Sequence, residues 1–291
     1  AHPMAFELQL DQPLAQELAR RATREIDGAL QRLDGTPDEA AIHAARRHIK
    51  KARAALRLRQ AEPRGTLADV DQALRQAGRA LSPSRDQAVL LRTVEALADG
   101  APPAATRALL RLRAQLAAAD EAPADDLQTA RDALRLARLR LADAIPTALP
   151  FAALADGFAG TYRRGRRALR RALDQPSAGR LHALRKALKH HLYQLRLLRG
   201  LWPALFDALE AQADQAAEQL GQHHDLAVLR ERLSASTLSA SERRRIDALA
   251  AWRQDELAAA ALATCRSLYA ERPRQVRDRL LALWETRLSQ D

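Results

Sequence analysis

Basic side chains gather on one short segment of the sequence. The fifteen positions from His43 to Arg57 hold six Lys or Arg residues and no acid. Like charges spaced three and four residues apart repel each other in a helix, by roughly a few tenths of a kcal/mol per pair. A ligand of opposite charge would remove this repulsion. The pattern therefore indicates a site that binds an anion carrying many charges.

A second segment repeats this pattern further along the chain. His182 follows His43 by 139 residues, and one gapless register relates the two segments. The same offset pairs Arg46 with Arg185, Arg47 with Lys186, Lys50 with Lys189, Arg57 with Arg196, and Asp86 with Asp225. Self-similarity at a fixed offset is typical of duplicated structural units. We predict a tandem duplication, with an N-terminal half at residues 1–148 and a C-terminal half at 149–291.

The composition predicts that both halves are helical. Hydrophobic residues make up 47% of the 291 residues, but only 3% are aromatic. Ala, Leu, Arg, Gln and Glu are strong helix formers, and prolines, which break helix interiors, separate segments of helical length. We expect the two basic segments to form helices from Pro37 to Gln60 and from Pro176 to Arg199, packed near each other. Ser82-Pro83-Ser84 should precede another helix, and Ser239 should open a long one that ends near Tyr269.

Helical geometry separates charge from apolar surface on these segments. At about 100° per residue, Arg46, Lys50, Arg53 and Arg57 share one edge of the first helix, and Arg47 and Lys51 lie on the other side of His43. The opposite face carries Ile42, Ile49 and Leu56 for the core. Arginines also recur before each segment. They are Arg20, Arg21 and Arg24 in the first half, and Arg163, Arg164, Arg166, Arg167, Arg170 and Arg171 in the second. A planar guanidinium suits phosphate oxygens.

Net charge and cysteine count narrow the class of protein. A net charge of +11 and a pI near 10.9 favour a polyanionic partner. No apolar run approaches the roughly 20 residues of a membrane span, and the N-terminal residues do not resemble a signal peptide, so we expect a cytoplasmic protein without membrane insertion. The single cysteine, Cys265, excludes an intrachain disulfide. The histidine spacings do not fit metal ligation, so we expect no metal and no cofactor.

The duplicated His-and-basic segments resemble the CHAD domain, the conserved histidine α-helical domain. The resemblance rests on H-x-x-R-x-x-x-K-K-x-R from His43, H-x-x-R-K-x-x-K-H-x-x-Y from His182, and the "LSPSRDQAVL" and "LGQHHDLAVL" stretches. It covers nearly the whole chain. It implies an all-α fold of two antiparallel four-helix bundles, related by a pseudo-two-fold axis, around a basic central channel. It also implies non-catalytic binding of inorganic polyphosphate and association with polyphosphate granules.

The predicted binding residues follow from the charge pattern and from this resemblance. They are Arg20, Arg24, His43, Arg46, Arg47, Lys50, Lys51, Arg53, Arg57, Arg163, Arg166, Arg167, Arg170, His182, Arg185, Lys186, Lys189, His190, Tyr193 and Arg196. The second segment departs from the family pattern, because Leu192 and His190 stand at positions of basic residues and His224 stands beside Asp225 where the family has Arg. Weaker binding by this half is therefore expected, unless the arginines of 163–171 compensate.

Other interpretations of the same residues stay open at this stage. A nucleic-acid binder would use the same basic face, although the chain has only ten aromatic residues for base stacking and no Asn for base reading. A phosphate-processing enzyme ranks last, because the basic segments lack the carboxylate clusters that hold Mg²⁺. The histidines either donate to phosphate when protonated or sit at a helix crossing. We interpret Asp86 and Asp225 as caps at helix starts, and Tyr193, Trp202, Trp252 and Trp284 as packing residues.

Overall fold

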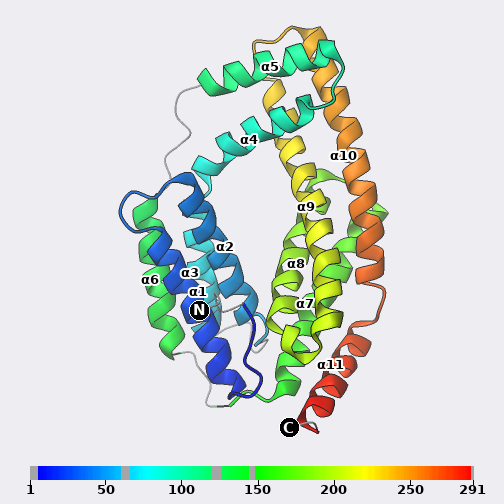
Figure 1. Ribbon diagram of the computed structural model, residues 1–291. Coiled ribbons are helices and arrows are strands. Elements are labelled where there is room, and N and C mark those ends of the chain that lie inside the picture. Colours follow the sequence, from blue (N-terminus) through cyan, green and yellow to red (C-terminus); the bar gives the residue numbers. More distant parts are fainter. Residues whose placement is uncertain (1–5, 60–65, 119–125, 144–147, 290–291) are drawn as a thin grey trace.

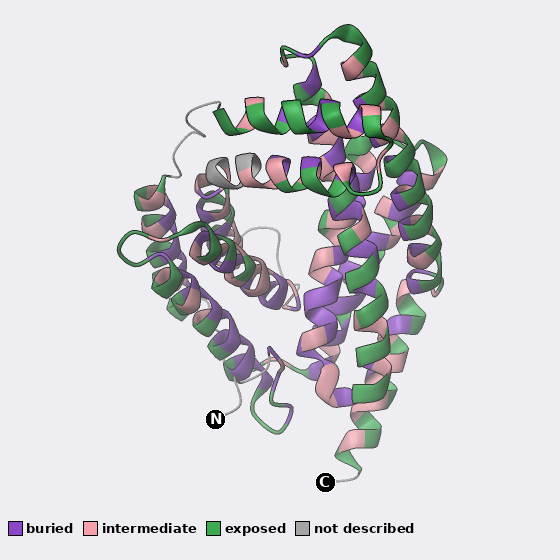
Figure 2. Ribbon diagram, turned by 45° about the horizontal axis from the view of Figure 1, so that its top comes forward, coloured by how far each residue is buried: buried purple, intermediate pink, exposed green. Residues whose placement is uncertain are grey.

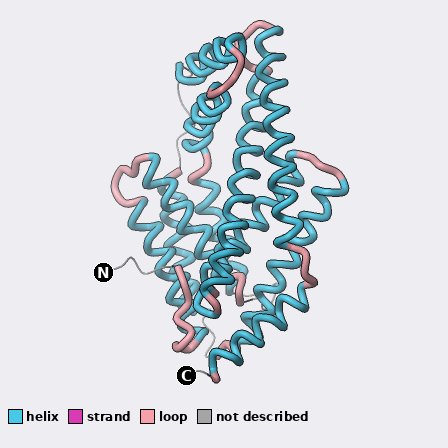
Figure 3. Tube along the Cα trace, turned by 45° about the vertical axis from the view of Figure 1, so that its right-hand side comes forward, coloured by secondary structure: helices cyan, strands magenta, loops and turns pink. Residues whose placement is uncertain are grey.

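The computed structural model describes residues 6–59, 66–118, 126–143 and 148–289, with the backbone alone at 66 and 83–87. Every regular element in this part of the chain is a helix (Figure 3). The helices are α1 (Leu14–Arg32), α2 (Glu39–Leu56), α3 (Thr66–Ala80), α4 (Pro83–Ala98), α5 (Pro103–Ala118), α6 (Leu127–Asp143), α7 (Phe151–Asp174), α8 (Ala178–Leu197), the 3-10 turn η1 (Arg199–Leu201), α9 (Pro203–Leu233), α10 (Ala240–Leu268) and α11 (Pro273–Leu288). The all-α prediction is confirmed.

The helices pack as two groups that share one continuous core. In the first, α1, α2, α3 and α6 lie against one another. In the second, α7, α8, α9 and α10 are packed in sequence, with α11 against α7 (Figure 1). One cluster of buried side chains, mainly Leu and Ala, runs through both groups. Figure 2 shows buried positions following the inward faces of the helices and exposed positions following their outer faces, as amphipathic helices require.

The two basic segments form helices with matching starts. Asp38 caps α2 by accepting a hydrogen bond from the N–H of Ala41, and Ser177 caps α8 by accepting one from the N–H of Arg180. Both pairs keep the 139-residue offset. The expected helix after Ser82 also begins at Pro83, and α10 begins with a capping box between Ser239 and Glu242.

The halves differ where one helix breaks and the other continues. Pro83 has no backbone N–H, and the chain leaves the helix between α3 and α4 just before it. The residue 139 positions later is Gln222, and α9 runs through it without a break. Asp225 therefore lies inside a helix, so the interpretation of Asp225 as a cap at a helix start is wrong. The side chain of Asp86 lies outside the described part.

The break sends α4 and α5 across to the other half of the molecule. These helices pack on the C-terminal part of α9 and on α10 (Figure 1). A second cluster of buried side chains, including Val94 and Leu109 from α4 and α5 and Leu229 and Ile246 from α9 and α10, closes this contact. The packing units thus interleave the two sequence halves. The division at 148/149 remains a prediction about the duplication.

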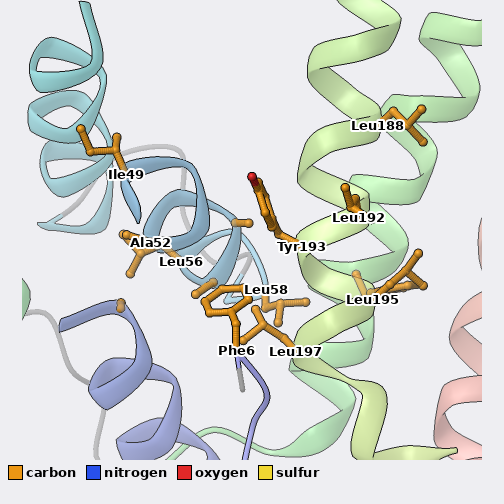
Figure 4. Close-up of a cluster of buried hydrophobic side chains, with 14 of the residues drawn as sticks. Phe6, Ile49, Ala52, Leu56, Leu58, Leu188, Leu192, Tyr193, Leu195 and Leu197 are labelled. Carbon is orange, nitrogen blue, oxygen red and sulfur yellow. The ribbon is translucent and has the colours of Figure 1, made fainter. Parts of the chain in front are cut away.

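The helices of the two basic segments lie against each other, as expected. The amide of Gln194 on α8 donates a 3.1 Å hydrogen bond to the carbonyl of Ala54 on α2. Figure 4 shows Tyr193 and Leu197 of α8 pointing toward Leu56, Leu58 and the N-terminal Phe6. This contact brings the basic edges of the two helices toward a common space.

Candidate functional site

A cavity of about 690 Å³ opens between α2 and α8, with α3, α4, α7 and α9 completing its walls. Among the lining residues whose side chains the structure describes, ten are Lys or Arg, and one, Asp225, is acidic. We call it the basic cavity. Its lining cations are Arg46, Lys50, Arg53, Arg57, Arg75, Arg79, Arg164, Arg185, Lys186 and Lys189. The cations come from α2 and the residue that ends it, and from α3, α7 and α8, so folding concentrates charge that the sequence spreads over 144 positions.

The fold brings half of the predicted binding residues to this cavity. They are Arg46, Lys50, Arg53, Arg57, His182, Arg185, Lys186, Lys189, His190 and Tyr193. All of them belong to α2, to its C-terminal cap or to α8, along the edges of the two helices that face each other. The edge of α2 that was predicted to carry Arg46, Lys50, Arg53 and Arg57 together does so.

The other predicted residues lie elsewhere, several of them held by local contacts. Arg20 donates to Glu17 at 2.7 Å, Arg166 donates to the carbonyl of Tyr269 at 3.1 Å, and Arg196 donates to Glu210 at 2.6 Å. The Lys51 ammonium lies 5.1 Å from the centre of the Phe6 ring. His43 lines a different cavity. The remaining five are exposed outside the lining: Arg24, Arg47, Arg163, Arg167 and Arg170.

Four Arg or His side chains of the described lining were not in the predicted set: Arg75, Arg79, Arg164 and His224. Arg75 and Arg79 are four residues apart on α3, a spacing that places them on one face. Arg164 belongs to the arginine run on α7, where only its position on the helix distinguishes it from its exposed neighbours. A helical projection of each segment against its apolar stripe could have found all three.

One carboxylate, Asp71, organises three of the arginines around the cavity. Its oxygens lie 2.7 Å from Arg53, 3.1 Å from Arg75 and 3.9 Å from Arg57. Burial alone would raise the pKa of Asp71, but the hydrogen bond and charge of Arg53, with the other arginines, lower it. Burial and repulsion from neighbouring arginines lower the pKa of Arg57 to about 10, although Asp71 opposes this. Three cations thus share one anion.

Arg46 fixes the end of α3 beside the cavity. Its guanidinium donates to the carbonyl of Gly78 at 3.1 Å, to the hydroxyl of Ser82 at 3.0 Å, and also to the carbonyl of Leu81. These carbonyls lie where the break before Pro83 leaves the helix without further N–H donors. Arg46 therefore holds the α3–α4 junction in addition to lining the cavity.

Histidines of α8 and α9 contribute polar ring atoms to the wall of the basic cavity. The rings of His182 and His224 lie 4.0 Å apart, centre to centre. Burial, with repulsion from His224 and from nearby Lys186 and Arg185, lowers the pKa of His182 to about 4. Burial and neighbouring arginines also lower the pKa of His190 well below its ordinary value. The sequence left two roles open for His182, a donor to phosphate when protonated or a residue at a helix crossing, and its lowered pKa favours the neutral ring at neutral pH.

The aromatic residues divide between packing and exposure. Tyr193 is buried, with its ring edge-on to Phe6 at 6.2 Å, and Trp284 stacks on Phe151 at 4.5 Å. Packing roles were expected for all three tryptophans. Trp202 and Trp252 are 50% and 57% exposed, so neither belongs to the core. Leu192, at a family basic position, is 1% exposed and belongs to the core.

Two further features concern metals and membranes. Among the residues whose side chains the structure places, no three His, Cys, Asp or Glu side chains gather in a way that could hold a metal ion. None of the described helices is both long and apolar enough to cross a bilayer. The buried thiol of Cys265 has its pKa raised to about 12 by burial.

The fold and the cavity define an all-helical protein that concentrates guanidinium and ammonium groups between two packed helix groups. The chain belongs to the CHAD domain family, whose model matches residues 12–234. The resemblance seen in the sequence is thereby confirmed.

Solved structures agree with this assignment at the level of the fold. The crystal structure of the CHAD domain from the plant Ricinus communis matches with a TM-score of 0.56 and 19% sequence identity, covering 92% of this chain and 95% of that chain. A comparison with curated proteins gives no match.

Proposed function

We propose that this chain binds linear inorganic polyphosphate in the basic cavity, without catalysing its reaction. The observation that carries the proposal is the ratio of charges among the described lining residues, ten Lys or Arg to one Asp. Cations crowded in this way raise one another's electrostatic energy, and a bound polyanion converts that repulsion into attraction. Family membership supports the same ligand, because the resemblance to the CHAD domain implies binding of polyphosphate.

The polar atoms of the wall suit phosphate oxygens, which only accept hydrogen bonds. Arg57 Nε, His182 Nδ1 and His190 Nδ1 are buried without a hydrogen-bond partner among the described residues. Buried polar atoms of this kind are costly unless something satisfies them. Arg57 Nε can only donate a hydrogen bond. A neutral imidazole carries one N–H, which sits on either Nδ1 or Nε2. Phosphate oxygens entering the cavity would accept from these groups.

The same cavity offers few contacts for the bases of a nucleic acid. Binding of single strands relies on aromatic faces on which successive bases stack. Tyr193 is the single Phe, Tyr or Trp of the lining, and its ring packs against Phe6, with the Arg196 guanidinium 5.6 Å from its centre. The basic cavity therefore offers cations for phosphates and no platform for a stacked strand. A ligand made of phosphates alone fits it better.

The test compares two sets of three positive charges. The cavity set replaces Arg79, Arg164 and Lys186 with Ala; none of these contacts a carboxylate among the described residues, so their loss should leave the fold intact. The control set replaces Arg163, Arg167 and Arg170 with Ala, which removes the same charge from the exposed side of α7. Affinity for long-chain polyphosphate is measured for both at several salt concentrations.

The cavity set should weaken binding at least tenfold, and should flatten the slope of log affinity against log salt by roughly 0.9 per lost phosphate contact, as for nucleic acids. The control set should weaken binding much less. Equal losses in the two variants would mean that binding follows global charge and that the cavity is not the site. Circular dichroism of both variants verifies that the helices are retained.

A further inference from the structure

A second cavity, of about 800 Å³, adjoins the first. It lies between α4, α9 and α10, with His43 at the start of α2 on its rim, and it shares Val89, Arg185 and Asp225 with the basic cavity. We call it the tryptophan cavity, after Trp252. The two spaces are therefore neighbours, and a ligand that occupied both would pass these three side chains.

The two cavities differ in net charge: the lining of the basic cavity has an excess of cations, whereas that of the tryptophan cavity is balanced. The tryptophan cavity is lined by three arginines and three carboxylates, which are Arg92, Arg185, Arg253, Asp99, Glu218 and Asp225. Two of these arginines are also paired with acids outside the lining, Arg92 with Glu39 at 3.1 Å and Arg253 with Glu256 at 3.0 Å. A space with balanced charge does not favour further phosphates. It favours an uncharged group attached to them.

The side chains of the tryptophan cavity suit a flat aromatic group. Trp252 lines it although its indole is 57% exposed, and Leu226, Leu249 and Leu257 supply apolar surface. Exposed indole faces provide stacking platforms for nucleobases. Gln222, from α9, brings an amide that can both donate to and accept from polar ring edges. A cavity of this size that combines apolar side chains with polar groups can hold a small organic ligand.

Arg185 stands where the two cavities meet, and a glycine permits its position. A Cβ at Gly221 would lie 3.2 Å from Nε of Arg185, closer than most side chains approach. The absence of a side chain at 221 lets the Arg185 guanidinium lie against the backbone of α9. A guanidinium at this boundary would meet the phosphate that joins an organic group to a phosphate chain.

We propose that the two cavities together bind a nucleoside polyphosphate, with its phosphates in the basic cavity and its base stacked on Trp252. The inference rests on the proposed function for the phosphate part of the ligand. It adds a recognition site for one organic end group, which an inorganic chain lacks. The nucleoside occupies one end only, so the stacked base does not need a platform within the basic cavity.

The test uses two probes of similar charge, adenosine 5′-tetraphosphate and linear inorganic tetraphosphate, titrated calorimetrically against the full chain. The variant is Trp252→Ala. Its matched control is Trp202→Ala, which removes an indole of similar exposure from a position outside both cavities. The wild-type chain should bind the adenosine-bearing probe roughly tenfold more tightly than the inorganic one, from base stacking. Trp252→Ala should abolish that advantage, and Trp202→Ala should keep it.

The outcomes separate this inference from the proposed function. If the inorganic probe binds well and the adenosine-bearing probe gains nothing, the inference is overturned while polyphosphate binding stands. The inference is overturned as well if Trp252→Ala and Trp202→Ala reduce the advantage equally. If neither probe binds the wild-type chain, the proposed function itself fails. Because the advantage is a ratio between two probes on one protein, partial loss of folded protein cancels from it.

Discussion

The helix pairs α2–α3 and α8–α9 are related by the 139-residue offset but differ in their charge. Beside α2, Arg53, Arg57 and Arg75 surround the single carboxylate of Asp71. At the related positions, Leu192 replaces Arg53, and the acids Glu210 and Asp214 stand opposite Arg196 and Lys189. One pair thus has an excess of cations, and the other is balanced.

The α1 and α7 helices differ in a complementary way. Arg164 on α7 lines the basic cavity, whereas the related residue on α1 is Glu25, which contacts His48 at 2.6 Å. The cavity therefore takes its charge from α2 and α3 of the first half and from α7 and α8 of the second. If the two helix pairs arose by the duplication that the sequence predicts, later substitutions removed cations from some related positions and kept them at those that line the basic cavity.

The largest expected effect comes from removing the carboxylate shared by three arginines. Asp71→Asn should lower the free energy of unfolding by about 2 kcal/mol, the cost of a broken buried pair reduced for partial solvent exposure. Glu210→Gln, at the related position, should cost about 1 kcal/mol or less, because Arg196 keeps Asp214 at 3.8 Å. Urea unfolding of both variants measures the difference.

Unfolding in the presence of polyphosphate extends the comparison between Asp71→Asn and Glu210→Gln. If the ligand takes the place of the lost carboxylate, it should stabilise Asp71→Asn more than the wild-type chain and Glu210→Gln by no more than the wild-type chain. Equal stabilisation of both variants would show that the charge excess beside α2 does not contribute to binding.

The related arginines Arg46 and Arg185 should separate stability from affinity. Arg46→Ala should lower the free energy of unfolding by about 2 kcal/mol, because charged hydrogen bonds to the carbonyls at the end of α3 are lost. Around Arg185, α9 continues and satisfies its own carbonyls, so Arg185→Ala should reduce polyphosphate affinity with a smaller change in stability. Thermal unfolding measures the stability of the two variants, and titration measures their affinity for polyphosphate. Equal losses of stability and of affinity in both variants would contradict the expected difference.

Arg75 and Asp214, again related by the offset, should act in opposite directions. Arg75→Ala removes a cavity cation and should flatten the salt dependence of polyphosphate affinity by roughly one unit. Asp214→Ala removes the partner of Lys189, 3.1 Å away, and should tighten binding to a smaller extent. Titrations at three salt concentrations test both, and changes of the same sign would contradict the comparison.

The smallest effect concerns pH and the related histidines His43 and His182. Because the pKa of His182 is about 4 in the folded chain and that of an ordinary histidine is 6.5, unfolding takes up a proton between these values. His182 therefore stabilises the fold above pH 6.5, and this contribution is lost as the pH falls toward 4. His182→Gln should reduce the loss of stability between pH 7 and 5, and His43→Gln gives the comparison at the related, exposed position. Urea unfolding at the two pH values provides the measurement.

The sequence predicted those features that depend on local patterns. Helix class, the cap of α10 and the shared edge of Arg46, Lys50, Arg53 and Arg57 follow from propensity, capping and periodicity. The predicted set included Arg163, Arg167 and Arg170 from the arginine run of α7 and left out Arg164; a helical projection separates them from Arg164, but only packing shows which face of α7 meets the cavity. Likewise, the exchange of Pro83 for Gln222 changes the path of a whole segment, and its consequence for α4 and α5 appears only in three dimensions.

The central claim is that the basic cavity binds polyphosphate in preference to nucleic acids. A comparison of affinities for three polyanions tests it most directly. The wild-type chain is titrated with long-chain polyphosphate, single-stranded RNA and duplex DNA, at equal phosphate concentration and at two salt concentrations. Because the basic cavity gathers cations and lacks a stacking platform, polyphosphate should bind most tightly at both salt concentrations. RNA or DNA that binds as tightly as polyphosphate, or more tightly, would contradict the account.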